Sequence, residues 1–563
     1  MDIYNINGNK HYDIAEGTTL ASLAEQIFPD GKINGQNVLA ALVDHRLKEL
    51  SFKMMIPHEV EFIGYDHPDG RRTYVRSLCF VLQKAVRELF PSAVLIIDYA
   101  LPSGLYCELR SPALTGTVPG EVLPVDAERI REIRQRMNEI ISRDLPFIKK
   151  KMNSEEAVEI FKANNQPDKA RLVRSIGSYT VSTYFLDGMA DTFYGPLVPS
   201  TGYLKTFALT QFKAGFCLQY PMDGDGARIE PMKKQAKIAA TLKYHSDWCS
   251  IIGVKGIGTL NTAILTGNAV KLINLAEAHH ERCYAEIADR IFQQKERIRI
   301  VFIAGPSSSG KTSSSLRIAN QCKVLGMNPK VIELDNYFVD REHTPRDEKG
   351  DYDFEALGAM DLELLNNQLN DLLSGKTVEI PKFNFKKGCR EKGFEMSLGE
   401  KDILIMEGIH ALNPEMVKSV DSSRIFRVYA SALTSLSIDE NNNISTSDNR
   451  LLRRMVRDNR VRGITPEETI QRWHSVRRGE NRNIFPFQEN ADAEFNSALI
   501  FELPMLKYYA EPLLRRISPS SPAYTEATRL LKFLDYIVAL SPDEIAAIPP
   551  TSIMREFIGG QTL

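Results

Sequence analysis

Long hydrophobic runs and paired cysteines are missing from this sequence. Apolar stretches such as Ala93–Ile97 are far shorter than the roughly 20 residues that a membrane-spanning helix needs. No secretory signal pattern opens the chain. The seven cysteines are scattered without a Cys-x-x-Cys pair, which argues against a disulfide framework and for a reducing compartment. We therefore expect a cytoplasmic protein that does not associate with a membrane.

A net charge is also nearly absent. The 70 Lys and Arg residues almost balance the 72 Asp and Glu residues, which gives a net charge of −2. No global basic field therefore indicates binding to nucleic acid. The hydrophobic fraction of 43% and the charged fraction of 25% are typical of globular proteins. A chain of 563 residues is too long for one core, so we expect about three or four domains.

A phosphate-binding loop is the most specific motif in the chain. The β-branched run Ile300–Ile303 predicts a buried strand, and a helical pattern follows from Ser313 to Leu325. Between them, Gly305–Thr312 has the spacing G-x-x-x-x-G-K-T. In such a loop, backbone N–H groups and the helix N-terminus face phosphate oxygens, the lysine reaches the β- and γ-phosphates, and the Thr hydroxyl can bind Mg²⁺. The alternative is a glycine-serine turn between two elements. The predicted nucleotide-binding residues are Gly305, Pro306, Ser307, Ser308, Ser309, Gly310, Lys311, Thr312 and Ser313.

Two further predicted strands end in acidic residues. Asp335 follows the apolar run Lys330–Leu334, and Glu407 follows Asp402–Met406. Because the carboxyl ends of parallel strands face the ligand crevice of an open α/β sheet, Asp335 is placed beside the γ-phosphate. Glu407 resembles the strand-end acid that holds Mg²⁺ or its water. A turn or helix-capping role is the alternative for both residues.

Four arginines follow a helical spacing later in the chain. Arg450, Arg453, Arg454 and Arg457 stand at i, i+3, i+4 and i+7, so they share one helix face. Four clustered guanidinium groups repel one another unless an anion neutralises them, which favours a phosphate-binding role. A solvated face with salt bridges is the alternative.

These motifs, in this order, resemble the uridine kinase and phosphoribulokinase family of P-loop kinases, roughly from Ile298 to Leu503. The resemblance implies ATP and Mg²⁺ as cofactors, and transfer of a phosphoryl group to the 5′-hydroxyl of a nucleoside. An alternative is another small alcohol as acceptor; a second is an NTP-dependent regulator that acts on RNA or the translation machinery. The roles implied by position are catalysis for Asp335, Lys311, Arg454 and Arg457; acceptor binding for Asp335, Tyr337, Glu355, Phe383, Arg454 and Arg457; and metal binding for Thr312 and Glu407.

One departure from the family concerns base recognition. In its pyrimidine-specific members a histidine five residues after the stacking aromatic contacts the base, and that position here is Gly388. Because a glycine offers no side-chain hydrogen bond, we expect strict uridine and cytidine selectivity to be lost. Purine nucleosides then become candidate acceptors.

The N-terminal part resembles two modules of threonyl-tRNA synthetase. Residues 1–66 resemble the ubiquitin-like TGS domain, and 67–221 resemble the editing domain, with Gly195–Gly202 (G-P-L-V-P-S-T-G) as the most specific run. That family places an H-x-x-x-H and a C-x-x-x-H motif at its editing site. The corresponding positions hold Arg76, Phe80, Phe193 and Leu197, which cannot bind zinc or activate water. A packing module, an oligomerisation surface and a sensor of a small ligand remain as roles for this scaffold.

The predicted fold class is α/β: a P-loop kinase with a parallel sheet flanked by helices, preceded by α+β TGS-like (β-grasp) and editing-like domains. After the two N-terminal domains, we expect a helical connection at 222–295, the kinase domain at 296–540 and a C-terminal tail at 541–563. The expected partner is a nucleoside substrate. Contact with nucleic acid through the TGS-like domain and assembly into a homo-oligomer are left open.

Overall fold

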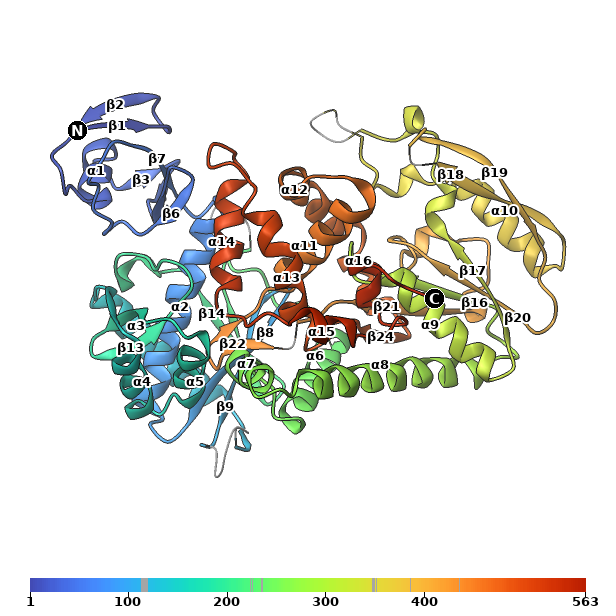
Figure 1. The fold of residues 1–563 in the computed structure, drawn as a ribbon, viewed down its shortest axis with the longest axis horizontal. Helices are drawn as coiled ribbons and strands as arrows, with labels where there is room; N and C mark the ends of the chain where they lie inside the picture. Colours follow the sequence, from blue (N-terminus) through green and yellow to red (C-terminus); the bar gives the residue numbers. More distant parts are fainter. Residues whose placement is uncertain are drawn as a thin grey trace.

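The two halves of the chain form separate sheets on either side of a central helical layer, as Figure 1 shows. The computed structural model describes residues 1–112, 120–222, 224, 226–233, 236–346, 350, 352–384, 386–434 and 436–563. Within these residues, no helix is both long enough and apolar enough to cross a membrane.

The first N-terminal module is a five-stranded mixed sheet with the order β2-β1-β7-β5-β6. Its central pair, β1 and β7, is parallel, and hairpins extend the sheet on both sides. Helix α1 begins after Thr19, whose hydroxyl accepts a hydrogen bond from the Ser22 N–H, and buries Leu20 and Leu23 against the sheet. This topology confirms the predicted β-grasp fold. The elements are β1 Asp2–Asn5, β2 Lys10–Asp13, α1 Leu20–Ile27, β3 Lys32–Ile33, β4 Gln36–Asn37, β5 Ala40–Val43, β6 Arg46–Lys48 and β7 His58–Ile63.

The second module packs helices against two antiparallel sheets. One sheet has the order β10-β9-β15-β14 with β8 paired to β9, and the other is β11-β12-β13. The long helix α2 buries much of its surface in the core between them. The elements are α2 Pro68–Leu89, β8 Val94–Leu101, β9 Gly104–Arg110, β10 Val122–Leu123, α3 Ala127–Ser142, β11 Ile148–Asn153, α4 Ser154–Ala163, α5 Pro167–Ile176, β12 Thr180–Leu186, β13 Met189–Thr192, β14 Ala208–Phe212 and β15 Gly215–Gln219.

The parallel sheet in the second half has the order β17-β20-β16-β21-β24, and every neighbouring pair is parallel. Its central strand β16 is fully buried, with an apolar core on each face. The three predicted strands are present, and helix α9 follows β16 directly, which confirms the predicted α/β fold. The elements are β16 Ile300–Ala304, α9 Lys311–Val324, β17 Asn328–Glu333, α10 Leu362–Leu373, β18 Val378–Asn384, β19 Cys389–Met396, β20 Asp402–Glu407, β21 Ile425–Ser431 and β24 Ala493–Asn496.

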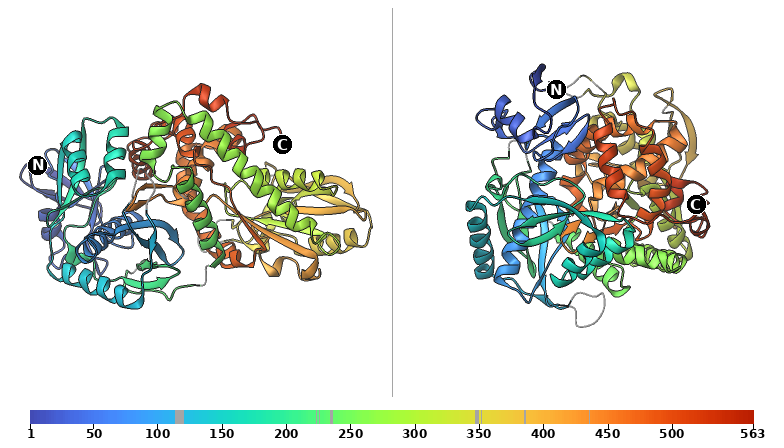
Figure 2. Two further views of the ribbon diagram at one scale, coloured as in Figure 1. Left: turned by 90° about the horizontal axis from the view of Figure 1, so that it is seen from below. Right: turned by 60° about the vertical axis from the view of Figure 1, so that its left-hand side comes forward.

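The central layer combines the connecting helices with the C-terminal ones around one large apolar core. Helix α8 runs from this layer to the parallel sheet, as Figures 1 and 2 show, and leads into β16. The elements are α6 Ala236–Ile251, α7 Ile257–Leu265, α8 Ala269–Phe292, α11 Thr446–Arg457, α12 Pro466–Asn483, α13 Glu502–Leu514, α14 Tyr524–Leu534, α15 Pro542–Ala546 and α16 Met554–Ile558.

A short hairpin from the second half docks in the N-terminal half. It consists of β22 (Ser437–Asp439) and β23 (Asn442–Asn443) and lies just before α11. The fully buried Lys169 Nζ lies 3.1 Å from Asp439 and 3.2 Å from Asp191. Because a buried ion pair holds only with good geometry on both sides, this contact fixes the start of α11 relative to the second module.

Candidate active site

The glycines of the phosphate-binding loop are required by its surroundings. A Cβ atom on Gly305 would lie 1.9 Å from the carbonyl oxygen of Ala430 in the neighbouring strand β21. Gly310 has a φ of 77°, in the left-handed region, and its Cβ would lie 2.2 Å from the side chain of Ile553. Since only glycine avoids both clashes and adopts this φ cheaply, the loop can turn tightly from β16 into α9.

The structure brings Lys311 and Thr312 to the strand-end acid Glu407. The Thr312 hydroxyl donates a hydrogen bond of 2.8 Å to Glu407 Oε1 at the end of β20. Lys311 begins α9, and its Nζ lies 3.4 Å from the carbonyl oxygen of Pro306. A hydroxyl and a carboxylate are the oxygen ligands that Mg²⁺ takes in proteins, so Thr312 and Glu407 fit the predicted metal site.

Asp335 and Glu407 end two strands that pair with each other in the sheet. Asp335 lies in the turn Leu334–Tyr337 directly after β17, which pairs with β20. Burial raises the pKa of Asp335, and the positive charges of Lys311 and Arg462 oppose that rise. Burial likewise raises the pKa of Glu407 to about 7, against the charge of Lys311. The two acids therefore share the electrostatic field of the same lysine.

Glu355 joins this group from a distant loop. A Cβ atom on Gly479 of α12 would lie only 2.4 Å from the Cβ of Glu355, so the absence of a side chain at Gly479 makes room for this acid. Burial and the neighbouring charge of Glu480 raise the pKa of Glu355 to about 7, while Arg454 and Lys311 oppose the rise. The sequence-selected residues Lys311, Asp335, Glu355 and Arg454 therefore interact electrostatically in one region.

Two of the four arginines on α11 support the loop from within the core. Arg450 is fully buried, pairs with Glu480 and donates a hydrogen bond of 2.9 Å to the carbonyl oxygen of Ser307. Arg453 is also fully buried, pairs with Glu502 and lies 3.4 Å from the carbonyl oxygen of Ser308. Protein carboxylates thus neutralise two of the charges for which the sequence pattern indicated an external anion.

The other two arginines, Arg454 and Arg457, retain more exposure. Their side chains are 15% and 16% exposed, and both lie near Asp458. Arg454 also donates a hydrogen bond of 2.8 Å to the hydroxyl of Ser307 in the loop. These are the two arginines that the family resemblance places over the phosphates.

Tyr337 and Phe383 occupy the edge of the site that the acceptor is expected to use. Tyr337 is fully buried, and its hydroxyl donates a hydrogen bond of 2.8 Å to Gln368 on α10. The Phe383 ring packs edge-on against Phe338, with 5.7 Å between centroids. Both side chains therefore pack into the wall that follows Asp335, and the Tyr337 hydroxyl is already bonded to Gln368.

Gly388 lies next to an arginine. Its φ is 73°, and a Cβ there would lie 2.8 Å from Nε of Arg341. The Arg341 backbone N–H also donates to the carbonyl oxygen of Gly388, at 2.8 Å. A guanidinium group therefore lies where the family's base-contacting histidine would project.

Sequence reasoning did not select Glu480. This fully buried acid accepts a hydrogen bond of 3.0 Å from the Ser307 N–H and pairs with Arg450 and Arg477. No spacing motif marks it, because its partners come from the loop, from α11 and from its own helix α12. Only the folded structure shows that Glu480 helps to hold the phosphate-binding loop in place, through Ser307 and Arg450.

The C-terminal segment also contacts the loop. The Ser313 hydroxyl donates a hydrogen bond of 2.6 Å to Glu556 on α16 and accepts one of 2.7 Å from Gln561. Figure 1 shows the C-terminus beside α9. Residues 541–563 are predicted to be a tail, and nothing in their composition signals that Ile553 and Glu556 reach the loop.

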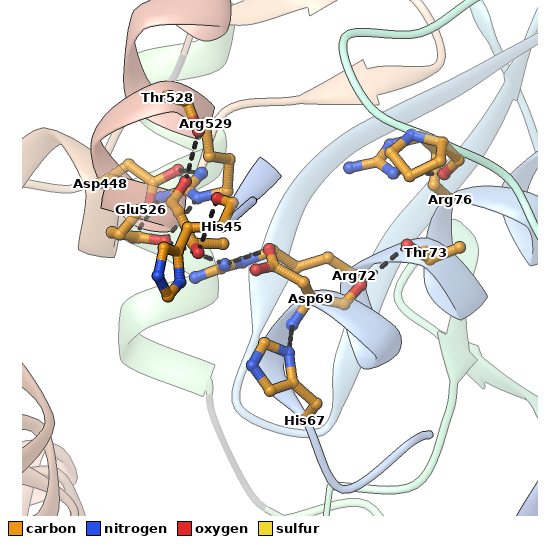
Figure 3. A network of polar contacts seen from close by, with 12 residues as sticks. His45, His67, Asp69, Arg72, Thr73, Arg76, Asp448, Glu526, Thr528 and Arg529 are labelled. Carbon is orange, nitrogen blue, oxygen red and sulfur yellow. Dashed lines mark hydrogen bonds and ion pairs between the residues drawn. The ribbon is translucent and has the colours of Figure 1, made fainter. Parts of the chain in front are cut away.

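A buried network of charges fastens α11 to the rest of the molecule, as Figure 3 shows. Arg529 of α14 donates to both oxygens of Asp448 on α11, at 2.7 and 2.8 Å, and also pairs with Glu526. Glu526 lies 3.2 Å from Arg72 of α2, which lies 2.8 Å from Asp69. The network therefore runs from the arginine-bearing helix to the second N-terminal module.

The four editing-site positions come together in that second module. The rings of Phe80 and Phe193 lie 5.4 Å apart, and Leu197 is buried beside them in the same core. Arg76 instead lies over the Tyr194 ring and donates a hydrogen bond of 2.7 Å to the carbonyl oxygen of Pro196. In the part of the chain that the structure describes, no group of three or more His, Cys, Asp or Glu side chains could hold a metal ion.

The parallel sheet, the glycine loop and the Thr312–Glu407 contact define a P-loop kinase. The model of the phosphoribulokinase / uridine kinase family matches residues 300–500. A uridine kinase of Macrococcus caseolyticus is 32% identical over 34% of this chain and 85% of its own length. The chain belongs to the phosphoribulokinase / uridine kinase family, and membership implies that it binds a nucleotide.

The N-terminal region matches a different group of proteins. A threonine–tRNA ligase of Pelobacter propionicus is 29% identical over 37% of this chain and 31% of its own length. The chain thus spans about a third of the length of the threonine–tRNA ligases that it matches.

A solved structure of a possible uridine kinase from Bacillus stearothermophilus is 23% identical over 26% of this chain and 80% of its own, with a TM-score of 0.21.

Proposed function

We propose that this protein transfers the γ-phosphoryl group of ATP to the 5′-hydroxyl of a nucleoside. The observation that carries the proposal is the junction of β16, β20 and β17, where Lys311, the Thr312–Glu407 pair and Asp335 share one electrostatic environment. Two aligned proteins with this kinase core, each covered over more than four fifths of its length, are uridine kinases, which supports a nucleoside as the acceptor.

Each residue in the proposed site has a role that its position supports. Backbone N–H groups of the loop and the N-terminus of α9 bind the phosphates of ATP. Lys311 and Arg454 stabilise the charge that develops on the transferred group. Asp335 orients the acceptor hydroxyl or takes its proton, and Glu355 holds the ribose hydroxyls. Mg²⁺, held by Thr312 and Glu407, would neutralise phosphate charge when bound.

The test separates this activity from the alternative of an NTP-dependent regulator. The full chain is incubated with ATP and Mg²⁺, and ADP release is measured with nucleosides, with other small alcohols and with RNA in parallel. We expect a nucleoside to stimulate ADP release, and RNA to have no effect. ADP release that depends on RNA and is indifferent to nucleosides would contradict the proposal and favour the regulator.

A further inference from the structure

A second cavity lies far from the phosphate-binding loop in the sequence and joins three parts of the chain. It has a volume of about 330 Å³, and its walls come from the β-grasp module, from the sheet β11-β12-β13 and from α14 with the residues after it. This volume lies within the roughly 300–1,000 Å³ that small-molecule sites occupy. Neither the proposed kinase reaction nor the P-loop uses this cavity.

One wall of the cavity is aromatic. Tyr184 and Phe193 line it with little exposed surface, because both also pack in the core of the second module, and the rings of Tyr194, Tyr536 and Phe52 line it as well. Aromatic rings provide apolar surface against which a planar ring can pack. Arg76 lies over the Tyr194 ring and Lys48 over the Phe52 ring, so each of these two rings has a cation over it. The replacement of polar editing-site residues by Phe193 contributes directly to this surface.

The cavity also has a positively charged part, here called the rim, which consists of three lysines. Lys48 and Lys149 come from two N-terminal modules, and Lys532 comes from α14. Burial in the cavity and the charges of Lys48 and Lys149 lower the pKa of Lys532; burial and the charges of Arg46 and Lys149 lower that of Lys48. The three ammonium groups therefore destabilise one another unless an anion lies between them.

The acidic residues of the cavity do not balance these charges. Glu49 already forms an ion pair with Lys149, at 2.9 Å, and accepts a hydrogen bond of 2.7 Å from the Tyr184 hydroxyl. Asp535 also lines the cavity, but no ion pair among the described residues joins it to a lysine. Lys48 lies 4.6 Å from the Phe52 ring and, like Lys532, has no carboxylate within 4.0 Å in the described chain. Two of the three ammonium groups are therefore available to a ligand.

We propose that this cavity binds a free nucleoside monophosphate, with the phosphate between Lys149, Lys532 and Lys48 and the base against the aromatic wall. The chemistry of the two walls requires both parts of such a ligand: ammonium groups bind the phosphate, and the rings stack on the base. A simple anion would leave the aromatic wall unused, and an uncharged nucleoside would leave the lysines repelling one another. This site is separate from the kinase site, and the inference does not rest on the proposed kinase activity.

Photolabelling with peptide mapping tests the proposal on the full chain. The probes are 8-azidoadenosine 5′-monophosphate and 5-azidouridine 5′-monophosphate, and labelled peptides are identified by mass spectrometry. We expect label within residues 176–196 or 524–540, and we expect unlabelled adenosine or uridine 5′-monophosphate to remove it. Label found only in peptides of the parallel-sheet half would overturn the proposal. Label in that half in addition to the expected peptides would report the kinase site.

Substitutions on the rim provide the decisive comparison. Lys48→Ala/Lys532→Ala should reduce labelling of the cavity peptides at least tenfold, and Lys532→Gln alone should reduce it severalfold. Both side chains are partly exposed and neither is paired with a carboxylate among the described residues, so the variants should fold, which a thermal melt verifies. Lys150→Ala is the matched control, because Lys150 is also exposed on β11 but does not line the cavity.

Two results would contradict the assignment. One is equal labelling of the cavity peptides in the double variant and in Lys150→Ala. The other is competition by a single-stranded RNA oligonucleotide with no competition by free monophosphates, which would make the site an RNA contact instead.

Discussion

At the residue scale, the chemistry of the site depends on a few contacts between elements that are adjacent in the sheet. The Thr312 hydroxyl meets Glu407 because β16 and β20 are neighbours and both end at the same edge. Asp335 joins them because β17 lies beside β20. The family resemblance and the rule for parallel strand ends were sufficient to select all three residues from the sequence.

Removal of the lysine charge should impair transfer far more than binding of the acceptor. Lys311→Ala should lower kcat by at least about a hundredfold, because a charge aimed at the transferred phosphoryl group is lost. Steady-state kinetics with ATP and the best nucleoside measure the effect. Lys323→Ala, at the exposed far end of α9, is the control and should keep near-normal kcat. A loss of less than about tenfold in Lys311→Ala would remove this lysine from the mechanism.

Replacement of the strand-end acid should separate binding from transfer. Asp335→Asn keeps the shape of the side chain but cannot take a proton, so it should abolish turnover and leave the Kd for ATP within about twofold. Isothermal titration and turnover are measured on the same preparation. Near-normal turnover in this variant would show that another group activates the acceptor.

Gly388 should relax base selectivity. The position lacks a side chain, and the nearby Arg341 presents donors only, so neither Gly388 nor Arg341 pairs uniquely with a pyrimidine edge. We expect uridine, cytidine, adenosine, guanosine and inosine to differ in kcat/KM by less than about a hundredfold, or about 2.7 kcal/mol. A larger preference for the two pyrimidines would mean that other residues, with Arg341 the first to test as Arg341→Ala, replace the histidine.

At the element scale, the helix α11 shows what the sequence could and could not predict. The arginine spacing placed four guanidinium groups on one face, and in the structure three of them, Arg450, Arg453 and Arg454, contact the loop, whereas Arg457 pairs with Asp458. The pattern could not show that Glu480 and Glu502 neutralise Arg450 and Arg453, because both acids approach from other helices. Charge patterning within one helix contains no information about partners that only tertiary packing supplies.

The same limit applies to the elements that surround the loop. Strand, loop and helix from Ile300 onward could be predicted because hydrophobic periodicity and glycine spacing are local signals. The contact of α16 with Ser313 could not, since it joins residues 243 apart in the chain. The β22–β23 hairpin docked on Lys169 was missed for the same reason.

Buried histidines of the connecting helices should make stability depend on pH. Burial, together with the neighbouring His279, lowers the pKa of His245 in α6 to about 3. A histidine with a depressed folded-state pKa contributes stability above its unfolded pKa of about 6.5 and loses it as pH falls toward 3. Between pH 7.5 and 5.5 this loss should be about 1.4 kcal/mol for His245 alone.

The variant His245→Phe should therefore show a smaller fall in Tm from pH 7.5 to 5.5 than the unmodified protein, whatever its Tm at pH 7.5. Thermal melts at the two pH values measure the difference. His474→Gln, on the exposed face of α12, should leave the pH dependence unchanged. An identical fall in His245→Phe and the unmodified protein would show that this histidine is already accessible to protons in the fold.

At the scale of the whole molecule, the kinase half and the N-terminal half are mechanically joined. The network from Asp448 through Arg529, Glu526 and Arg72 to Asp69 connects α11 with α14 and α2. Helix α14 also carries Lys532 of the second cavity. The helix that carries Arg454 and Arg457 is thus joined by this network to residues of the second N-terminal module.

Loss of the central arginine of this network should weaken both stability and activity. Arg529→Met leaves Asp448 buried without its partner and Glu526 with Arg72 alone, which should cost about 3–5 kcal/mol. We expect a lower Tm and a lower kcat, because α11 loses its anchor. Arg515→Met is the control: its pair with Glu511 is exposed and should contribute at most about 1 kcal/mol. Equal effects of the two substitutions would contradict the anchoring role.

The most direct test of the central claim is the identity and stoichiometry of the product. The full chain is incubated with ATP, Mg²⁺ and one nucleoside at a time, and ADP and the nucleoside product are quantified together, with the position of the phosphate determined by NMR. We predict one nucleoside 5′-monophosphate per ADP, and none with Asp335→Asn. ADP without a phosphorylated nucleoside, or a phosphate on a different acceptor, would contradict the assignment of this protein as a nucleoside kinase.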